Sequence, residues 1–504
     1  MKNNRREFLK SISALSLVTT VGFTSSFGIT GSGMSEIKAR RPLRKIGLVK
    51  IITPKDIGES PLGIGCETLD RDLWKPKEIF PWMDHLPVKW ARLQTGWARV
   101  EKVRGQYDWS WLDESVNGLV KRGFKPFFNV GYGNPNYTEG DTGYYPMVSD
   151  EAIAAWKKFI TELVLRYKGR IEYFELWNEP NLSGFWKPTK PDPAKYVELV
   201  KLTAPVIREN YPEAKIIGGV VSRLPFDFIR SLFDNGLGKE IDIFSFHPYG
   251  TRPEDYIGPI RKLRMLIDEY NPAIRIWQGE NGYPSQPNSS GFVGEAPWTE
   301  NVQAKFMLRR QLLDCSLGID MTLWFLIVDI HDYPKGSGKV NYKGILRVKP
   351  VVQPKVAFKA MQNIGSIING KVKSEPVVVG FSENGKNLSV LTSQSDNSEN
   401  GEQSPGIYST LLSIGRGTVL AYWDTSRAAD EYTPRNIDLV LSGTSFNGFR
   451  NPVLVDLLSG DVFELGSNAV KGQKSKEILA FQQLPLADYP MLIVERNNLE
   501  YTNL

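Results

Sequence analysis

One pattern recurs between residues 61 and 365 of this chain: a short apolar run ends in polar residues, and a helical stretch follows. The eight runs are PLGIGCE (61–67), VKWARLQ (88–94), KPFFNVG (125–131), IEYFELWNE (171–179), AKIIGGVVS (214–222), IDIFSFH (241–247), AIRIWQGE (273–280) and MTLWFLI (321–327). Several are continuously apolar, as strands of a parallel sheet are when both faces are buried. Eight strand–helix units predict a (β/α)8 TIM barrel. A doubly wound open sheet is the alternative, but the sequence has no GxGxxG or GxxxxGK[ST] motif to support it.

The segments between these runs have apolar residues spaced i, i+3, i+4, which is typical of helices with one buried face. The predicted helices are 109–123, 151–167, 193–210, 254–270 and 301–318, with a last one at 356–364 after the eighth run. The sequence therefore predicts a catalytic-type barrel over residues 61–365.

After residue 365 the pattern changes to short runs rich in branched residues, separated by turn signals. Such a pattern is typical of an antiparallel β-sandwich, which we expect over residues 366–504 as an accessory domain. The strand-like segment KIGLVKII lies before the barrel, and we expect residues 45–60 to contribute a strand to that sandwich.

The chain begins with a basic stretch followed by an uncharged, moderately apolar one. Residues 1–33 are predicted to be a signal peptide, and the Arg5-Arg6-x-Phe8-Leu9-Lys10 run resembles a twin-arginine export signal. An ordinary signal peptide or anchor is the alternative. We expect a bacterial protein exported to the periplasm or secreted, with no membrane span in the mature chain.

The composition narrows the functional classes. The net charge of +6 is a mild surplus, and no basic patch is interleaved with aromatics, so nucleic-acid binding is not indicated. Two cysteines and three histidines occur without any metal-ligand spacing, so we expect no metal site and no cofactor. The 13 Trp and 20 Tyr would suit sugar rings, although aromatic residues more often fill cores.

Polar residues follow several of the predicted strands. Since the active site of such a barrel lies at the carboxyl ends of its strands, these residues are expected to converge there. Glu179 ends the fourth strand and Glu280 the seventh. Paired carboxylates on strands nearly opposite in the ring suit glycosidic bond cleavage, because one can protonate the leaving oxygen while the other attacks the sugar. The other candidates near the strand ends are Arg92, Asn178, His247, Tyr249 and Trp324.

FELWNEPNLSGFW (174–186) resembles the acid/base segment of glycoside hydrolase clan A, the retaining (β/α)8 glycosidases with glutamates on strands four and seven. Within that clan it is most similar to glycoside hydrolase family 39, the β-xylosidase and α-L-iduronidase family. The resemblance covers roughly residues 60–365, and VRGQYDWSWLD (103–113) is a further segment of the clan type.

The resemblance implies a role for each candidate. Glu179 would be the general acid/base and Glu280 the nucleophile, with their carboxyl groups about 5–5.5 Å apart. The roles it implies for the substrate-binding residues are as follows: Asn178 would bind the 2-hydroxyl, Arg92 would hold Glu280 ionised, His247 and Tyr249 would orient the nucleophile or touch the sugar, and Trp324 would floor the subsite. Trp186 is a candidate on its loop position alone, either to stack on a sugar or only to pack.

Each of these residues also has a purely structural interpretation. A strand-end glutamate can cap a helix, Arg92 can be an ordinary buried ion-pair partner, and His247 or Trp324 can fill the core. Glu175 points to the barrel interior by the two-residue period of a strand, and we expect it to be structural with Arg92 or Lys89 as its partner.

The function expected is that of a retaining O-glycoside hydrolase, exo-acting and β-xylosidase-like, on oligosaccharides or polysaccharides of plants or hosts. An endo-acting glycanase of the same clan and a non-catalytic carbohydrate-binding barrel are the alternatives. The sugar stays open among xylose, galactose, arabinose and uronic acids. An acidic sugar would need a cationic clamp, for which Lys187, Lys190 and Arg252 are candidates. The sequence does not indicate an oligomeric state.

Overall fold

The computed structural model describes residues 43–250, 252–291, 296–395, 405–415, 417–442, 449–465, 470–472 and 478–504. The predicted signal peptide (1–33) lies outside the described residues. Among the helices of the described part of the chain, none is both long and apolar enough to cross a bilayer.

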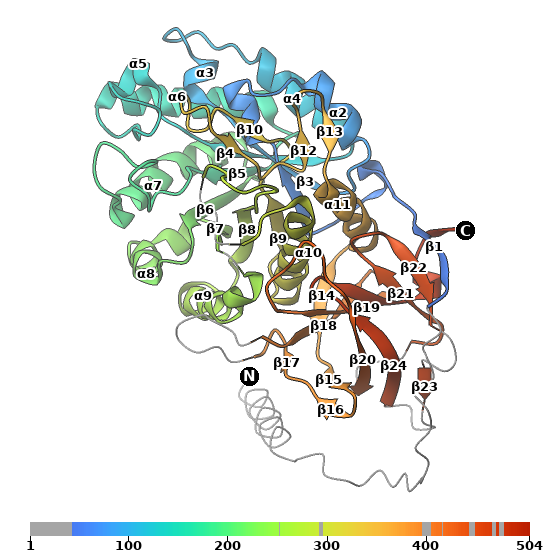
Figure 1. Cartoon of the computed structure of the whole chain (residues 1–504). Helices are drawn as coiled ribbons and strands as arrows, with labels where there is room; N and C mark the ends of the chain where they lie inside the picture. Colours follow the sequence, from blue (N-terminus) through green and yellow to red (C-terminus); the bar gives the residue numbers. More distant parts are fainter. Residues whose placement is uncertain are drawn as a thin grey trace, which may run out of the picture. The chain divides into compact units, whose positions relative to one another are not determined.

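Eight parallel strands close into a barrel, so the predicted fold class is confirmed (Figure 1). In order around the ring they are β2 (Leu62–Gly65), β3 (Trp90–Gln94), β4 (Lys125–Val130), β5 (Tyr173–Leu176), β6 (Lys215–Ser222), β7 (Ile243–His247), β8 (Arg275–Asn281) and β9 (Met321–Trp324). Each strand lies within one of the eight predicted runs, apart from the last residue of β8, because those runs carry the apolar residues that both faces of the sheet bury.

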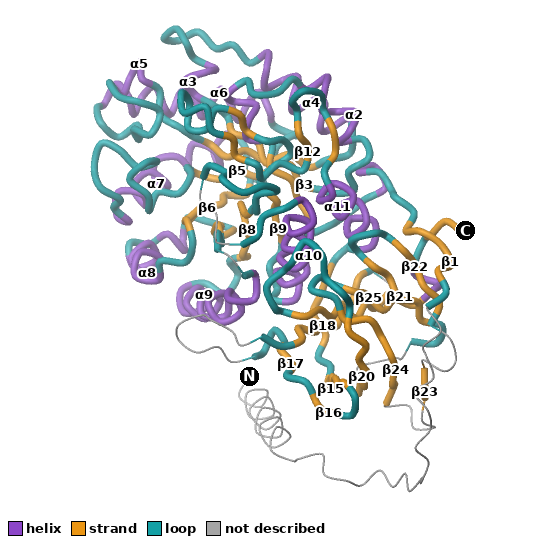
Figure 2. Tube along the Cα trace, viewed as in Figure 1, coloured by secondary structure: helices purple, strands orange, loops and turns teal. Residues whose placement is uncertain are grey.

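Helices follow the strands and surround the barrel, as the purple and orange tubes of Figure 2 show. They are α2 (Pro76–Met83), α3 (Trp97–Val100), α4 (Ser110–Lys121), α5 (Pro135–Thr138), α6 (Asp150–Tyr167), α7 (Pro193–Asn210), α8 (Phe226–Asp234), α9 (Ile257–Tyr270), α10 (Glu300–Ser316) and α11 (Val356–Ile367). Several begin at side-chain caps: Ser149, Asp192 and Thr299 each accept a hydrogen bond from a backbone N–H of the first turn.

Short 3-10 helices and two small hairpins fill the connections. The 3-10 helices are η1 (Pro54–Asp56), η2 (Glu67–Arg71), η3 (Leu237–Lys239), η4 (Pro253–Tyr256) and η5 (Arg496–Asn498). After β9, the strands β10 (Ile330–His331) and β11 (Val340–Asn341) pair with each other, as do β12 (Leu346–Arg347) and β13 (Gln353–Pro354). Both hairpins belong to the long segment that joins the eighth barrel strand to α11.

The remaining strands form two sheets. The nine-stranded sheet contains β1 (Lys45–Val49), β14 (Val372–Glu375), β17 (Val390–Leu391), β18 (Ile407–Ile414), β19 (Gly417–Asp424), β21 (Pro452–Asp456), β22 (Asp461–Glu464), β25 (Met491–Glu495) and β26 (Tyr501–Asn503). The five-stranded sheet contains β15 (Val378–Glu383), β16 (Lys386–Asn387), β20 (Arg435–Ser442), β23 (Val470–Gly472) and β24 (Ile478–Leu486). The strand before the barrel, β1, pairs antiparallel with β22 and β26. Within these two sheets, all described strand pairs are antiparallel except β17 with β18, which is parallel.

Helix α10 differs from the amphipathic helix predicted at 301–318, because every residue from Val302 to Ser316 is buried. Its charged side chains are matched rather than exposed. Lys305 pairs with Asp488 of the sandwich at 2.9 Å, and Arg309 donates to the backbone oxygen of Ser426 at 2.8 Å. The helix is therefore shared between the barrel wall and the sandwich.

Candidate active site

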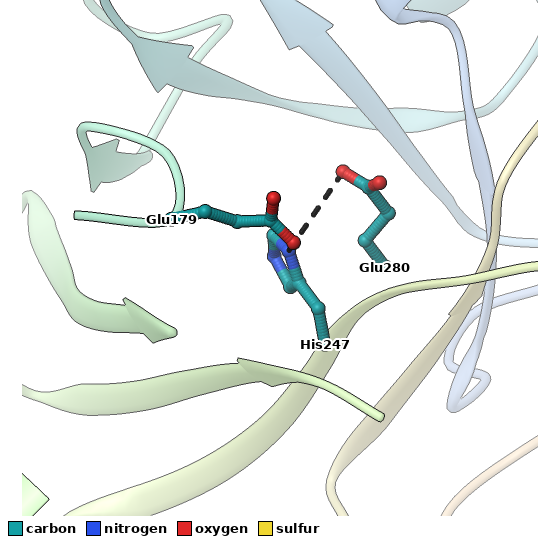
Figure 3. A group of neighbouring side chains, drawn as sticks. All are labelled: Glu179, His247 and Glu280. Carbon is teal, nitrogen blue, oxygen red and sulfur yellow. Dashed lines mark hydrogen bonds and ion pairs between the residues drawn. The ribbon is translucent and has the colours of Figure 1, made fainter. Parts of the chain in front are cut away.

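Two carboxylates face each other at the carboxyl ends of the barrel strands. Glu179 follows β5, and Glu280 is the penultimate residue of β8. His247 ends β7. One oxygen of each carboxylate and one ring nitrogen of His247 all lie within 4.8 Å of one another. Figure 3 shows the two carboxylates pointing toward each other with the imidazole beside them. This spacing fits the short separation of retaining glycosidases rather than the ~6.5–9.5 Å of inverting ones.

Arg92 of β3 is fully buried beneath this pair and holds several acceptors at once. Its Nε donates to Glu175 at 2.6 Å, and its Nη2 donates to Asn178 at 2.9 Å. Its Nη1 donates to two carboxylates, Glu67 and Glu280, each at 3.0 Å. One guanidinium thus orients four side chains from three strands, β2, β5 and β8.

Glu280 has the environment of an ionised carboxylate. The Tyr249 hydroxyl donates to its Oε1 at 2.6 Å, and Arg92 donates to its Oε2 at 3.0 Å. Burial opposes ionisation, but the charges of His247 and Arg92, the hydrogen bond from Tyr249 and the charge of Lys343 outweigh it and lower the pKa of Glu280. A carboxylate held in this state is suited to nucleophilic attack.

Glu179 is aimed by an unusual backbone. It and Trp177 have φ of 45° and 70°, the left-handed region that residues other than glycine rarely adopt. Hydrogen bonds fix this turn: the Glu179 N–H donates to the Val220 carbonyl at 2.8 Å, and the Asn129 side chain donates to the Trp177 carbonyl at 2.6 Å. Strain retained in this way is characteristic of functional sites, where a side chain must be placed accurately.

His247 connects the two carboxylates. Its Nδ1 lies 3.1 Å from Glu179 and 3.9 Å from Glu280, and the ring is fully buried. Burial lowers the pKa of the ring, but the carboxylates of Glu280 and Glu179 outweigh that effect and raise the pKa of His247. A protonated ring donates its Nδ1–H to Glu179, which fixes the direction of that carboxylate.

Glu175 lies one layer below and is satisfied on both oxygens. It accepts from Arg92 and from Asn129 on Oε2, and from Ser245 on Oε1 at 2.8 Å. Gly279 makes room for it, because a Cβ there would lie 2.2 Å from the Ser245 hydroxyl oxygen and 2.9 Å from Glu175. The structural role expected for Glu175, with Arg92 as partner, matches these contacts, whereas Lys89 donates to backbone carbonyls instead.

Glu67 is a site residue that the sequence reasoning missed. Glu67 follows β2, is 4% exposed and lines the same cavity as Glu179 and Glu280. Burial raises the pKa of Glu67 to about 7, an effect that Arg92 reduces and Glu280 reinforces. The signal was available, because Glu67 ends the first apolar run just as Glu179 and Glu280 end later ones.

Lys343 is the second residue that was missed, and it comes from the segment after β11. It lines the cavity, is 2% exposed, and its Nζ lies 4.4 Å from the centre of the Tyr249 ring. Burial lowers the pKa of Lys343 to about 8, against the attraction of Glu280 and Glu179. Its backbone is fixed, since its carbonyl accepts from Trp324 Nε1 at 3.1 Å. No strand end marks this position in the sequence.

The cavity above the carboxylates measures about 220 Å³. Its aromatic lining consists of Tyr132, Phe185, Tyr249, Phe325 and Tyr333, and Asn178 contributes an amide. Since the Asn178 Oδ1 accepts from Arg92, the amide offers its Nδ2–H groups to a ligand.

Two tryptophans that were predicted to contact the sugar do not line this cavity. Trp324 is 1% exposed and packs against Tyr283, and Trp186 is fully buried against Tyr145 and Trp177. Neither lines the cavity, whereas their sequence neighbours Phe325 and Phe185 do. In both places the larger ring fills the protein interior and the adjacent phenylalanine faces the ligand space.

None of the lysines or arginines considered for an acidic-sugar clamp lines the cavity. Lys187 pairs with Asp141, and Arg252 lies 3.9 Å from Asp255. The cations that do line it are Lys343 and Arg71.

Glu179, His247 and Glu280 could in principle present one ligand atom each to a metal ion. The surrounding charges disfavour such use. Arg92 and Tyr249 already donate to Glu280, and the Lys343 ammonium acts on both glutamates. The donor set is better suited to proton transfer than to cation binding.

A larger cavity of about 940 Å³ lies at the opposite ends of the barrel strands, next to β14. Its rings are Trp90 and Tyr173, which Lys125 approaches to 5.4 and 4.8 Å. None of its described lining residues belongs to the cluster of Glu179, His247 and Glu280, so the chemistry is placed at the smaller cavity.

The sequence matches the model of glycosyl hydrolases family 39 over residues 90–261. This chain resembles that family. The resemblance indicated by the WNEPN segment is therefore confirmed. The matched range includes Arg92, Asn178, Glu179, His247 and Tyr249 but ends before Glu280, whose place in the site comes from the structure.

A β-xylosidase from Geobacillus stearothermophilus is 25% identical over 192 residues, which are 32% of this chain and 38% of that protein. The chain thus matches well under half the length of this curated relative. Among solved structures, a family 39 glycoside hydrolase from Bacteroides cellulosilyticus superposes with a TM-score of 0.64 at 18% identity, over 89% of this chain and 82% of that one.

Two further structures share the fold. A monomeric β-xylosidase from Caulobacter crescentus has a TM-score of 0.55 at 17% identity, over 89% of this chain and 98% of that one. A family 30 endoxylanase from Clostridium papyrosolvens has a TM-score of 0.56 at 12% identity, over 89% and 97%. At these identities the likeness concerns the architecture of the barrel and its sandwich.

Proposed function

We propose that this chain is a retaining, exo-acting β-glycosidase with a β-xylosidase-like substrate. The observation that carries the proposal is the pair of buried carboxylates with oxygens within 4.8 Å, of which Glu280 has a lowered pKa and Glu179 contacts a histidine. Two carboxyl groups at this separation and in different environments are what double displacement at an anomeric carbon needs.

In the first step, Glu280 attacks the anomeric carbon and a covalent glycosyl–enzyme ester forms. Glu179 gives its proton to the departing oxygen as the bond to the leaving group breaks. Arg92 and Tyr249 keep Glu280 ionised and directed until it reacts, and Asn178 donates to a hydroxyl of the sugar. His247 orients the Glu179 carboxyl for the transfer.

In the second step, Glu179 is ionised and takes a proton from a water molecule. The resulting hydroxide attacks the anomeric carbon, the ester bond to Glu280 breaks, and the sugar leaves with its original configuration. Both residues return to their starting states.

Exo action is supported by the size of the cavity. At about 220 Å³ it is smaller than the ~300–1,000 Å³ of pockets that enclose drug-sized ligands, which suits one sugar ring better than a chain. The β-xylosidase activity named for the Geobacillus stearothermophilus relative supports a pentose. An endo-acting glycanase would need a longer cleft along this face.

We also propose that the chain is exported to the periplasm or secreted, on the basis of its basic, Arg5-Arg6-containing start and the uncharged stretch that follows. Replacing both arginines with lysine should retain the protein in the cytoplasm. Unchanged export of the double variant, seen by cell fractionation, would exclude the twin-arginine route.

The function is tested with a panel of aryl glycosides of pentoses, hexoses and uronic acids in both anomers. Wild type should cleave one sugar, and Glu280→Ala should be inactive until azide or formate is added, which should give a product of inverted configuration. Glu179→Ala should lose about 10²–10⁴-fold on poor leaving groups and much less on activated ones. Silence of well-folded wild type on the panel, with cleavage of a polysaccharide, would establish endo action instead.

A further inference from the structure

Glu67 and Glu280 share one hydrogen-bond donor. The Arg92 Nη1 lies 3.0 Å from Oε1 of Glu67 and 3.0 Å from Oε2 of Glu280. All three side chains are buried, with 5% and 12% of the two carboxylate side chains exposed and none of the arginine. Two carboxylates held this close in a buried site resist being ionised together, so one of them tends to keep a proton.

The surroundings decide which carboxyl keeps it. Glu280 receives the Tyr249 hydroxyl at 2.6 Å and lies 3.9 Å from His247, in addition to Arg92. Glu67 has its share of Arg92 and a hydrogen bond from its own backbone N–H, and its Oε2 has no hydrogen-bond partner in the described part of the chain. Charge is therefore best stabilised on Glu280, and Oε2 of Glu67 is the oxygen left to carry a proton.

We propose that Glu67 is a positioning residue of the active site: it stays neutral in the working enzyme, so that Arg92 directs its charge to the nucleophile Glu280, and its ionisation draws Arg92 away from Glu280 and lowers activity. This inference rests on the proposed glycosidase function. It adds a third carboxyl group, that of Glu67, to the site. It also predicts a fall of activity at high pH that is set by Glu67 and not by the acid/base residue Glu179.

The groups that face Glu67 fit this role. They are Arg92 from β3, Glu280 from β8, Tyr249 after β7, and the buried thiol of Cys66 beside it in the chain. Only Arg92 among them is a cation. The pKa of Glu67, raised to about 7, places its ionisation in the range where such an enzyme would work. Gly65 leaves the space that the carboxyl occupies, because a Cβ there would lie 2.3 Å from Oε2.

The direct test is Glu67→Gln, since an amide has the shape of a neutral carboxyl but does not ionise. The kcat/KM of wild type, of this variant and of a matched surface control, Glu500→Gln, is followed from about pH 5 to pH 9 on the glycoside that wild type cleaves. Relative to its own maximum, the kcat/KM of Glu67→Gln should fall on the alkaline side about one pH unit or more above the fall of wild type, because the amide stays neutral. The control should follow wild type throughout.

An alkaline limb at the wild-type position in active Glu67→Gln would overturn the proposal, as would a uniform loss of activity with an unchanged profile. If wild type cleaves no glycoside at all, the proposed function fails, and the role of Glu67 must be tested without turnover.

Thermal unfolding supplies that second measurement. Between the ordinary pKa of a glutamate and about pH 7, folded wild type holds a proton that the unfolded chain has lost, so this group makes wild type less stable as the pH rises. The Tm of Glu67→Gln minus that of wild type should therefore increase across this range. A difference that does not change with pH would contradict a proton on Glu67.

Discussion

Two buried arginines of this chain each organise carboxylates, and they do so with different balances of charge. Arg309 of α10 donates from Nε and Nη2 to both oxygens of one carboxylate, Glu254, and its other bonds go to backbone oxygens of the sandwich. Arg92 serves three carboxylates at once: Glu67, Glu175 and Glu280. The Arg309 cluster has one carboxylate for its arginine and is matched, whereas the Arg92 cluster has three carboxylates for its arginine and is unmatched.

The carboxyl groups respond accordingly. Burial opposes ionisation of Glu254, but the charge and hydrogen bonds of Arg309 and the Trp423 donor prevail and lower the pKa of Glu254. At Arg92 one cation is shared: burial raises the pKa of Glu67 to about 7 because its share of Arg92 does not offset burial. At Glu280 the charges of His247 and Arg92 and the Tyr249 hydrogen bond outweigh burial and lower the pKa. A matched cluster holds two parts of the fold together, whereas an unmatched one keeps protons available for chemistry.

The largest effect is expected from breaking the unmatched cluster. Arg92→Met removes a cation that helps to keep Glu280 ionised, so kcat/KM should fall by about 10²–10³-fold, the range found when a group that stabilises charge in a reaction is removed. Steady-state kinetics on the preferred aryl glycoside measures the loss, with circular dichroism to verify folding. A folded variant within tenfold of wild type would show that Arg92 is not needed.

Breaking the matched cluster should affect stability instead. Arg309→Met leaves Glu254 buried without its cation, which typically costs about 3–5 kcal/mol of unfolding free energy. Because Arg309 lies outside the cavity, kcat/KM of the remaining folded protein should stay close to wild type. Denaturant unfolding and kinetics on the same preparation separate the two effects, and loss of turnover without loss of stability would invert the comparison.

A smaller and more specific change is Tyr249→Phe. It removes the 2.6 Å hydrogen bond to Glu280 and leaves Arg92 in place. Because that bond helps to hold the pKa of Glu280 low, the acid limb of kcat/KM should move to higher pH, with about tenfold lower activity on that side. A pH–rate profile that scales down without moving would mean that Tyr249 acts only on the substrate.

The fold could be predicted because the barrel strands are short and mostly buried, and several of them are apolar along their length. The candidate residues Glu179, Glu280, Arg92 and His247 could be found for a related reason, since parallel strands end at one edge of the barrel. Glu67 obeys the same rule and was overlooked, because no resemblance drew attention to the first strand.

The rest of the site depends on information that local sequence does not carry. Lys343 reaches the cavity from a long segment after the last barrel strand, and its place is fixed by distant contacts such as the bond from Trp324. At two positions the aromatic residue that lines the cavity is the sequence neighbour of the one that was predicted. In FW (185–186) and WF (324–325) either ring could face the ligand, and packing assigns the tryptophan to the interior.

The sandwich shows a similar limit. The sequence predicts a sandwich over residues 366–504 but not how its strands pair: β18 lies between β14 and β19 in one sheet, and β24 lies between β20 and β23 in the other. IYSTLLSI and ILAFQQLPL mix polar residues into their runs, so their strand character comes from pairing partners that are distant in sequence.

In the proposed mechanism, Glu280 is the nucleophile, and Arg92 and Tyr249 help to hold it ionised. The most direct measurement is to treat the enzyme with the 2-deoxy-2-fluoro analogue of its preferred glycoside, which accumulates the covalent intermediate, and to locate the label by peptide mass spectrometry. The label should be found on Glu280, in a one-to-one ratio with lost activity. A label on Glu67 or Glu179, or full activity with product of inverted configuration and no label, would contradict the account.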